Sequence, residues 1–268
     1  MKHTILTILV ILLTFAFCGC TNKSSNSNLP VEKSTSTPAS NDLTDQTAQA
    51  STKQDKIKVG HIHLYGEEHA VKRILEKELD LWKTYYHDKG LRHLFIEQPY
   101  YSAEYLNLWM HADNDVILEE LYKDWVGTSS HSENVLNFYK SIKAECPETI
   151  FHGIDVGHQH QTTGKRFLEY LKSNHQENTE MYKRTEESIQ QGQHYYGIIT
   201  KDHVYRENTM TQNFIREYNL LNGADIMGIF GGAHTDIVGM NYQTHQVPCM
   251  ANQLKAIYGD ALRAKILL

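Results

Sequence analysis

The sequence has little of several features on which common protein classes depend. Basic residues are not in excess, because 26 Lys and Arg face 32 Asp and Glu, and no Lys/Arg stripe marks a nucleic-acid interface. The four cysteines show no CxxC or Cys/His finger spacing, which argues against a structural zinc site. Apolar residues make up 40%, below the roughly 45–50% of globular domains. This deficit falls between Thr21 and Asp55, and the rest of the chain can bury a normal core.

A long apolar run is also lacking, and the longest one lies at the N-terminus. Ile5 to Phe17 follows Lys2 and would span only about 20 Å as a helix, too short for a bilayer core of about 30 Å. Such a run is typical of a signal peptide. Gly19-Cys20 resembles a bacterial lipobox, so residues 1–19 are predicted to be a lipoprotein signal peptide and Cys20 to carry a lipid such as palmitate. An ordinary secretory signal is the alternative.

Residues 20–55 are predicted to form a disordered polar tether between a membrane and the folded domain. Short polar side chains with Pro30 and Pro38 cannot bury enough apolar area to offset the entropy of ordering them. Removing Lys2 with the signal changes the formal charge from −6 to −7, so the lipid alone would hold the protein in the cell envelope. In this exported setting Cys146 and Cys249 could form a disulfide, or they could be buried free thiols.

Residues 56–268 are predicted to form a single α/β domain. Strand candidates cover 57–65, 91–96, 149–154, 225–230 and 264–268, and Pro99 is expected to prevent the second from continuing as a central strand. Helical spacing covers 71–82, 116–125, 133–146, 164–171, 177–190, 201–221 and 250–258. The strands are apolar runs rather than strict alternations. This pattern indicates a mostly parallel central sheet flanked by helices, with a helical insertion after the second strand.

Four of these strands end in chemically capable side chains, which parallel strands would bring to one edge of the sheet. The residues at the four ends are Glu67, Glu68 and His69; Glu97; Asp155; and His234. Gly66 and Gly231 each precede a histidine by three residues and allow a tight turn there. Two histidines with carboxylates match a hydrolytic metal site whose ligands would be His69, His234, Glu67 and Glu97. They equally match a metal-free site in which histidine is the general base.

Three further groups could border this site. His203, Arg206 and Glu207 share a helical stripe with Met210 and Phe214, and we expect Arg206 to point into the site and bind or stabilise negative charge. A solvated Arg–Glu pair is the alternative. His158 and His160 follow Asp155 closely, but a loop position fixes no geometry. Tyr195 and Tyr196 could stack on a flat ligand or simply pack with their hydroxyls in water.

The ordered set of these motifs resembles the erythromycin-esterase-like proteins and their wider relatives, the Tiki metalloproteases and the ChaN haem-uptake lipoproteins. The resemblance is carried by Gly66-Glu67-Glu68-His69, Ile96-Glu97, Trp125 with Thr128 and Glu133, Gly153-Ile154-Asp155, Arg206-Glu207 with Met210 and Asn213, and Gly231-x-x-His234. It implies an α/β fold in which His69 is the general base, Glu67 and Glu97 are its acidic partners, and His234 is the later histidine. The esterases space Glu and His by one more residue and follow the histidine with glycine, whereas Ala70 follows here.

These observations favour a membrane-tethered extracytoplasmic hydrolase of ester, lactone or peptide bonds. His69, alone or through one divalent metal ion, would activate water for attack on a small molecule or peptide. The alternative that the resemblance implies is a surface lipoprotein that binds haem or iron, as ChaN does.

Overall fold

The structure is a computed structural model that describes residues 59–197 and 199–267. The predicted signal peptide, Cys20 and the tether lie outside these residues. No helix within them combines the length and the apolar character needed to cross a bilayer.

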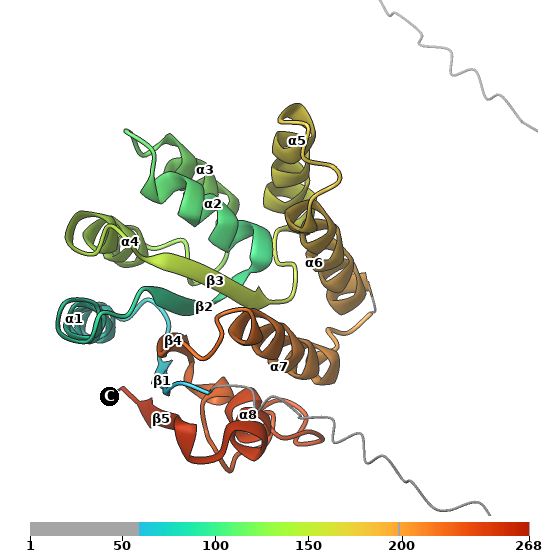
Figure 1. Cartoon of the computed structure of the whole chain (residues 1–268). Helices are drawn as coiled ribbons and strands as arrows, with labels where there is room; N and C mark the ends of the chain where they lie inside the picture. The colour runs from blue at the N-terminus through green and yellow to red at the C-terminus, as the bar shows by residue number, and fades with distance from the viewer. Residues whose placement is uncertain (1–58, 198, 268) are drawn as a thin grey trace, which may run out of the picture. The chain divides into compact units, whose positions relative to one another are not determined.

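Within the described residues, five parallel strands form one sheet in the order β3-β2-β4-β1-β5 (Figure 1). The strands are β1 (Ile62–Glu67), β2 (His93–Pro99), β3 (Ile150–Asp155), β4 (Ile226–Gly231) and β5 (Leu262–Ile266). Their apolar residues face alternate sides. In β2, for example, Leu94 and Ile96 enter one core cluster and Phe95 enters the other. Both faces are therefore covered, as parallel sheets require.

Two groups of helices cover the two faces of the sheet. The first face packs against α1 (Lys72–Lys89), α2 (Tyr100–Met110), α3 (Val116–Asp124) and α4 (Glu133–Glu145). The second packs against α7 (His203–Asn219) and α8 (Met250–Tyr258). Between β3 and α7 the chain forms a π-helical turn η1 (His160–Gly164), α5 (Lys165–Ser173) and α6 (Glu180–Gly197). Short 3-10 turns follow β4 (η2, Gly232–His234) and α8 (η3, Gly259–Ala261).

The expected α/β architecture with a helical insertion between the second and third strands is confirmed. Helix α2 was not predicted, because seven of its residues are buried and its sequence therefore lacks an amphipathic pattern. The expectation that Pro99 would prevent the second strand from continuing as a central strand is confirmed, because beyond Ile96 β2 pairs with β3 alone. Pro99 is the last residue of β2, but the ladder between β2 and β4 already ends at Ile96, so the missing N–H interrupts no hydrogen bond there.

The two cysteines of the folded domain are buried and free. Of the two possibilities left open by the sequence, the structure therefore has free thiols rather than a disulfide. Cys146 follows α4, and Cys249 immediately precedes α8, where its Sγ donates to the carbonyl oxygen of Asp236.

Candidate active site

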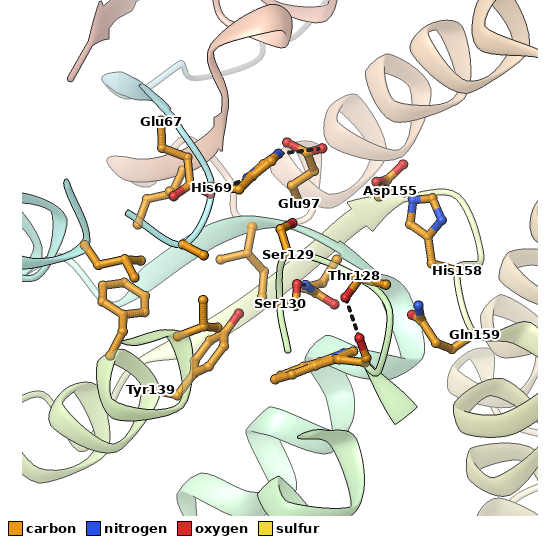
Figure 2. Close-up of a pocket in the computed structure, with 18 of the residues that line it drawn as sticks. Glu67, His69, Glu97, Thr128, Ser129, Ser130, Tyr139, Asp155, His158 and Gln159 are labelled. Atoms are coloured by element: carbon orange, nitrogen blue, oxygen red, sulfur yellow. Dashed lines mark hydrogen bonds and ion pairs between the residues drawn. The ribbon is translucent and has the colours of Figure 1, made fainter. Parts of the chain in front are cut away.

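The carboxyl ends of β1, β2, β3 and β4 bring together most of the side chains that the sequence singled out. Glu67 ends β1 in register with Gly231 of β4, and Asp155 ends β3 beside Pro99 of β2. The helices that follow neighbouring strands lie on opposite faces of the sheet, and such an arrangement opens a crevice beyond the strand ends. Figure 2 shows the resulting row of side chains, from Glu67 and His69 through Glu97 to Asp155 and His158.

Glu97 lies at the centre of this crevice. Its Oε2 accepts a 2.6 Å hydrogen bond from the backbone N–H of Gly231, and its Oε1 accepts one of 2.7 Å from Arg206 Nη2. The Nε2 atoms of His69 and His234 face the same Oε1 at 3.8 and 3.6 Å. Burial alone would raise the pKa of Glu97, but the positive charges around it hold that pKa below its ordinary value. One buried carboxylate thus connects both of the Gly-x-x-His corners.

Arg206 extends the charged network from Glu97 to Asp155. Its Nε donates to Asp155 Oδ1 at 2.9 Å and its Nη2 to Oδ2 at 2.6 Å, which is a bidentate pair. Asp155 is only 1% exposed. Although burial opposes ionisation, the charges of Arg206 and His158 hold the pKa of Asp155 well below its ordinary value. The helical stripe on α7 therefore does direct Arg206 into the crevice, as expected.

Glu207 contacts the His234 ring at Nδ1, on the side away from Glu97. Its Nδ1 lies 2.9 Å from Glu207 Oε2, and Glu207 also accepts hydrogen bonds from Asn241 Nδ2 at 2.9 Å and from the backbone N–H of Met250 at 2.6 Å. That N–H belongs to the first turn of α8, where the helix dipole stabilises negative charge. Burial lowers the pKa of His234, but Glu97 and Glu207 outweigh it and raise that pKa overall. Glu207 therefore orients the ring and directs its Nε2 toward Glu97.

His69 is the most accessible member of the network, with 42% of its side chain exposed. Its Nδ1 lies 2.8 Å from Glu67 Oε1, so the carboxylate fixes the ring and leaves Nε2 directed toward the crevice. The hydrogen bond to Glu67, opposed by burial and reinforced by Glu97, raises the pKa of His69 to about 9. Gly231 permits this position, because a Cβ there would lie 2.9 Å from His69 Nε2.

Glu78 of α1 extends the site in a way that was not predicted. Its side chain is fully buried and borders the cavity beside Glu67. Burial, together with the charge of the neighbouring Glu67, raises the pKa of Glu78 to about 9, so the carboxyl is neutral at pH 7. The sequence did contain a signal, since Glu78 lies on the apolar stripe of Ile74, Leu75 and Trp82, where a carboxyl group is out of place.

Two cavities meet at this network. The first cavity has a volume of about 290 Å³ and the second, which is more open to solvent, about 320 Å³, and Glu67, His69, Glu97 and Arg206 border both. Aromatic and aliphatic side chains line one wall of the first cavity, and its other wall carries Asp155, His158 and Tyr196. The second is bordered by Glu68, Gln243 and the turn from Gly231 to His234. His69 is therefore placed where both spaces are accessible.

Two of the expected site residues lie away from these cavities. Glu207 borders neither cavity and contacts Nδ1 of His234. His203 also borders neither cavity, and its Nδ1 lies 3.4 Å from the Tyr195 hydroxyl. Sequence reasoning also missed the segment after α3, from which Trp125 and the residues 128–130 border the first cavity. Their only sequence signal was the match of Trp125 and Thr128 to the esterase-like pattern.

The side chains considered as metal ligands do not fit a metal ion in this arrangement. In the part of the chain that the structure describes, no group of three or more His, Cys, Asp or Glu side chains is placed to hold one. The Arg206 guanidinium lies 2.7 Å from Glu97 Oε1, the oxygen that both histidines face. A divalent cation bound to that oxygen would be repelled by Arg206.

Comparison with solved structures finds the same fold in longer proteins. A mutant of the erythromycin esterase EreC in its open conformation aligns with a TM-score of 0.53 and 10% identity, over 77% of this chain and 69% of that one. A succinoglycan biosynthesis protein aligns with a TM-score of 0.56 and 10% identity, over 76% of this chain and 65% of that one. A Bacillus cereus protein aligns with a TM-score of 0.51 and 10% identity, over 78% and 66%.

This chain spans about two thirds of the length of those proteins. No family model and no curated protein matches its sequence. The resemblance expected from the ordered motifs is nonetheless confirmed at the level of the fold: this chain has the fold of the erythromycin-esterase-like proteins.

Proposed function

We propose that this protein is a hydrolase in which His69 activates water for attack on a carbonyl carbon. One observation carries the proposal: Glu67 holds Nδ1 of a histidine that is 42% exposed, so its Nε2 is directed into the junction of two cavities. The nearest carboxylate oxygen, on Glu97, lies 3.8 Å from Nε2. That distance exceeds a direct hydrogen bond and leaves Nε2 available to a water molecule.

In this mechanism the neutral His69 takes a proton from water at Nε2 while the resulting hydroxide attacks the carbonyl carbon. Glu67 stabilises the imidazolium that forms, as the acidic partner of a histidine base does. Negative charge then develops on the carbonyl oxygen. Arg206 and His234 border the second cavity, and the guanidinium of Arg206 together with the Nε2 side of the His234 ring would stabilise this oxyanion.

The bond to be cleaved is an ester, a lactone or a peptide bond, because all three require the same activated water. The shared fold with erythromycin esterase favours an ester or lactone. Ester and peptide libraries assayed with the wild type, His69→Ala and the matched control His87→Ala test the mechanism. His87 is an exposed histidine in the last turn of α1. Equal rates for wild type and His69→Ala would remove His69 from the mechanism.

A separate measurement distinguishes a metal-dependent mechanism from the histidine-base mechanism. Elemental analysis of the purified wild type and of His234→Ala reveals any bound metal and whether His234 helps to hold it. A stoichiometric metal lost in His234→Ala would replace the histidine base by a metal-activated water.

We also propose that the enzyme acts outside the cytoplasm, attached to the membrane through a lipid on Cys20. The support is the sequence of residues 1–55, with its apolar run, its lipobox-like Gly19-Cys20 and its polar tether. Expression of the full chain and of Cys20→Ser with labelled palmitate provides the test. Label and membrane association in Cys20→Ser equal to those of the full chain would overturn the anchor.

A further inference from the structure

The segment that follows Asp155 has unusual backbone geometry. Gln159 has a positive φ of 53°, which side chains other than glycine rarely adopt, and the next residues form the π-helical turn η1. Both features are costly and occur often at functional sites. The preceding residue, His158, lies on the wall of the first cavity.

A contact between two glycines joins this segment to α6. A Cβ on Gly157 would lie 2.0 Å from the carbonyl oxygen of Ser188, and a Cβ on Gly192 would lie 2.0 Å from the carbonyl oxygen of Gly157. Only glycine at both positions allows the backbones to approach this closely. Tyr196 is four residues beyond Gly192 and therefore lies on the same face of α6. The contact thus fixes His158 relative to Tyr196.

His158 connects Asp155 to Tyr196. Its Nε2 lies 2.8 Å from Asp155 Oδ2, and its Nδ1 lies 2.5 Å from the Tyr196 hydroxyl. The Tyr101 hydroxyl donates a further hydrogen bond to the His158 carbonyl oxygen. Tyr196 is 39% exposed and borders the first cavity, and its hydroxyl is hydrogen-bonded to His158.

This cluster and His69 lie on different sides of the same cavity. His69 and Glu67 are on one side, and Asp155 and His158 are on the other, beyond Glu97 (Figure 2). Water activation by His69 accounts for one proton transfer in hydrolysis. The departing oxygen or nitrogen also needs a proton, and the proposed scheme does not yet supply it.

We infer that Tyr196 is a catalytic acid that protonates the leaving group, with His158 and Asp155 as positioning residues that resupply its proton. The inference rests on the proposed hydrolase function. In the imidazolium form of His158 both ring nitrogens donate, to Asp155 and to Tyr196. The Tyr196 hydrogen is then free to point into the cavity.

The protons and electrons balance in this step. As the tetrahedral intermediate collapses, the bond from the carbonyl carbon to the leaving atom breaks, and its electron pair stays on the leaving atom. That atom takes the hydroxyl proton of Tyr196, and the Tyr196 oxygen takes the Nδ1 proton of His158. Solvent then restores the proton of His158.

The surroundings of the pair keep the phenol protonated until it is used. Burial, with smaller contributions from Tyr195 and Asp155, raises the pKa of Tyr196 to about 12. The charged and titratable groups that face His158 and Tyr196 are Asp155, Arg206, Tyr101, Tyr195, His160 and Lys201.

The test compares two substrates that share an acyl group and differ in the leaving group. An ethyl ester has a poor leaving group that needs a proton, whereas a nitrophenyl ester has a good one that does not; an alkyl amide and a nitroanilide serve if the wild type cleaves amides. Tyr196→Phe should lower kcat/KM for the poor leaving group about 100-fold or more and change it little for the good one. His158→Gln should show the same selectivity. Tyr170→Phe, a similarly exposed tyrosine on α5 outside the cavities, is the matched control.

A structural role for Tyr196 would instead lower both rates by the same factor, and that result overturns the inference while leaving the proposed function intact. Unchanged rates on both substrates overturn it equally. A wild type that cleaves none of the four substrates refutes the proposed hydrolase function, and the inference with it. Circular dichroism and thermal unfolding of each variant identify a loss of rate that comes from misfolding.

Discussion

Replacing Glu67 by glutamine should lower the pKa of His69 and move the pH dependence of hydrolysis to lower pH. The Glu67 hydrogen bond is the largest contribution that raises this pKa to about 9, and the charge of Glu67 adds to it. Glutamine preserves the shape of the side chain but removes that charge. The pKa should then fall toward the ordinary histidine value of about 6.5.

The magnitude follows from the fraction of neutral His69, because only the neutral ring can accept a proton. With a pKa of about 9, roughly 1% of the molecules are neutral at pH 7, against roughly 75% with an ordinary pKa of about 6.5. In the wild type, kcat/KM should therefore rise about tenfold per pH unit up to about pH 9. In Glu67→Gln the rise should level off at a clearly lower pH, with a lower plateau because the ring is less firmly oriented.

Two measurements check this prediction independently. The pH profile of kcat/KM between pH 5 and 10 reports the group that controls the rate, and an NMR titration of the His69 ring without substrate reports its pKa directly. Glu76→Gln is the control, since Glu76 is an exposed glutamate of α1 that pairs with Lys72. A His69 pKa that stays the same in Glu67→Gln, or a wild-type profile that is flat between pH 7 and 9, would refute the reasoning.

Three other predictions concern the rest of the network. Arg206→Lys should lower kcat/KM by about 10-fold or more, because lysine cannot reproduce the bidentate bond to Asp155; a wild-type rate would contradict this role. Glu78→Gln should gain stability relative to the wild type as pH rises from about 4.5 to 9, because over that range the unfolded Glu78 is ionised while the folded one must hold a proton. Urea unfolding at pH 5, 7 and 9 measures the difference, and a constant difference would exclude the raised pKa. Haemin added to the protein should show no shift of its Soret band, because the carboxylates of Glu97 and Asp155 line the first cavity and the haem propionates are anionic; a saturable shift would favour the haem-binding alternative.

The strand ends could be predicted from the sequence because they follow from one rule. Parallel strands bring their carboxyl ends to one edge of the sheet. The end of each strand is marked in the sequence by a polar residue after an apolar run, and these residues are Glu67, Glu97, Asp155 and His234. Likewise Arg206 stood out because a charge interrupts the apolar stripe of α7. These residues required only a local pattern and a correct fold class.

What could not be predicted depends on contacts between distant segments. Glu78 is neutral only because burial and Glu67 act on it together. Tyr196 reaches His158 only because Gly157 meets Gly192, a contact that no periodicity contains. His203 shows the opposite error, since it shares the helical spacing of Arg206 but lies beside Tyr195 instead.

Arg206, His69 and His234 all face Glu97 Oε1, so energetic effects at this site should be strongly non-additive. Removing His69 changes the field felt by His234, and removing His234 does the same to His69, although they follow different strands. A double-mutant cycle on the pair should therefore give a coupling free energy well away from zero, on the order of 0.5–3 kcal/mol. Substitutions at the two corners are best regarded as perturbations of one cooperative unit, in which each single-residue effect depends on the state of the other.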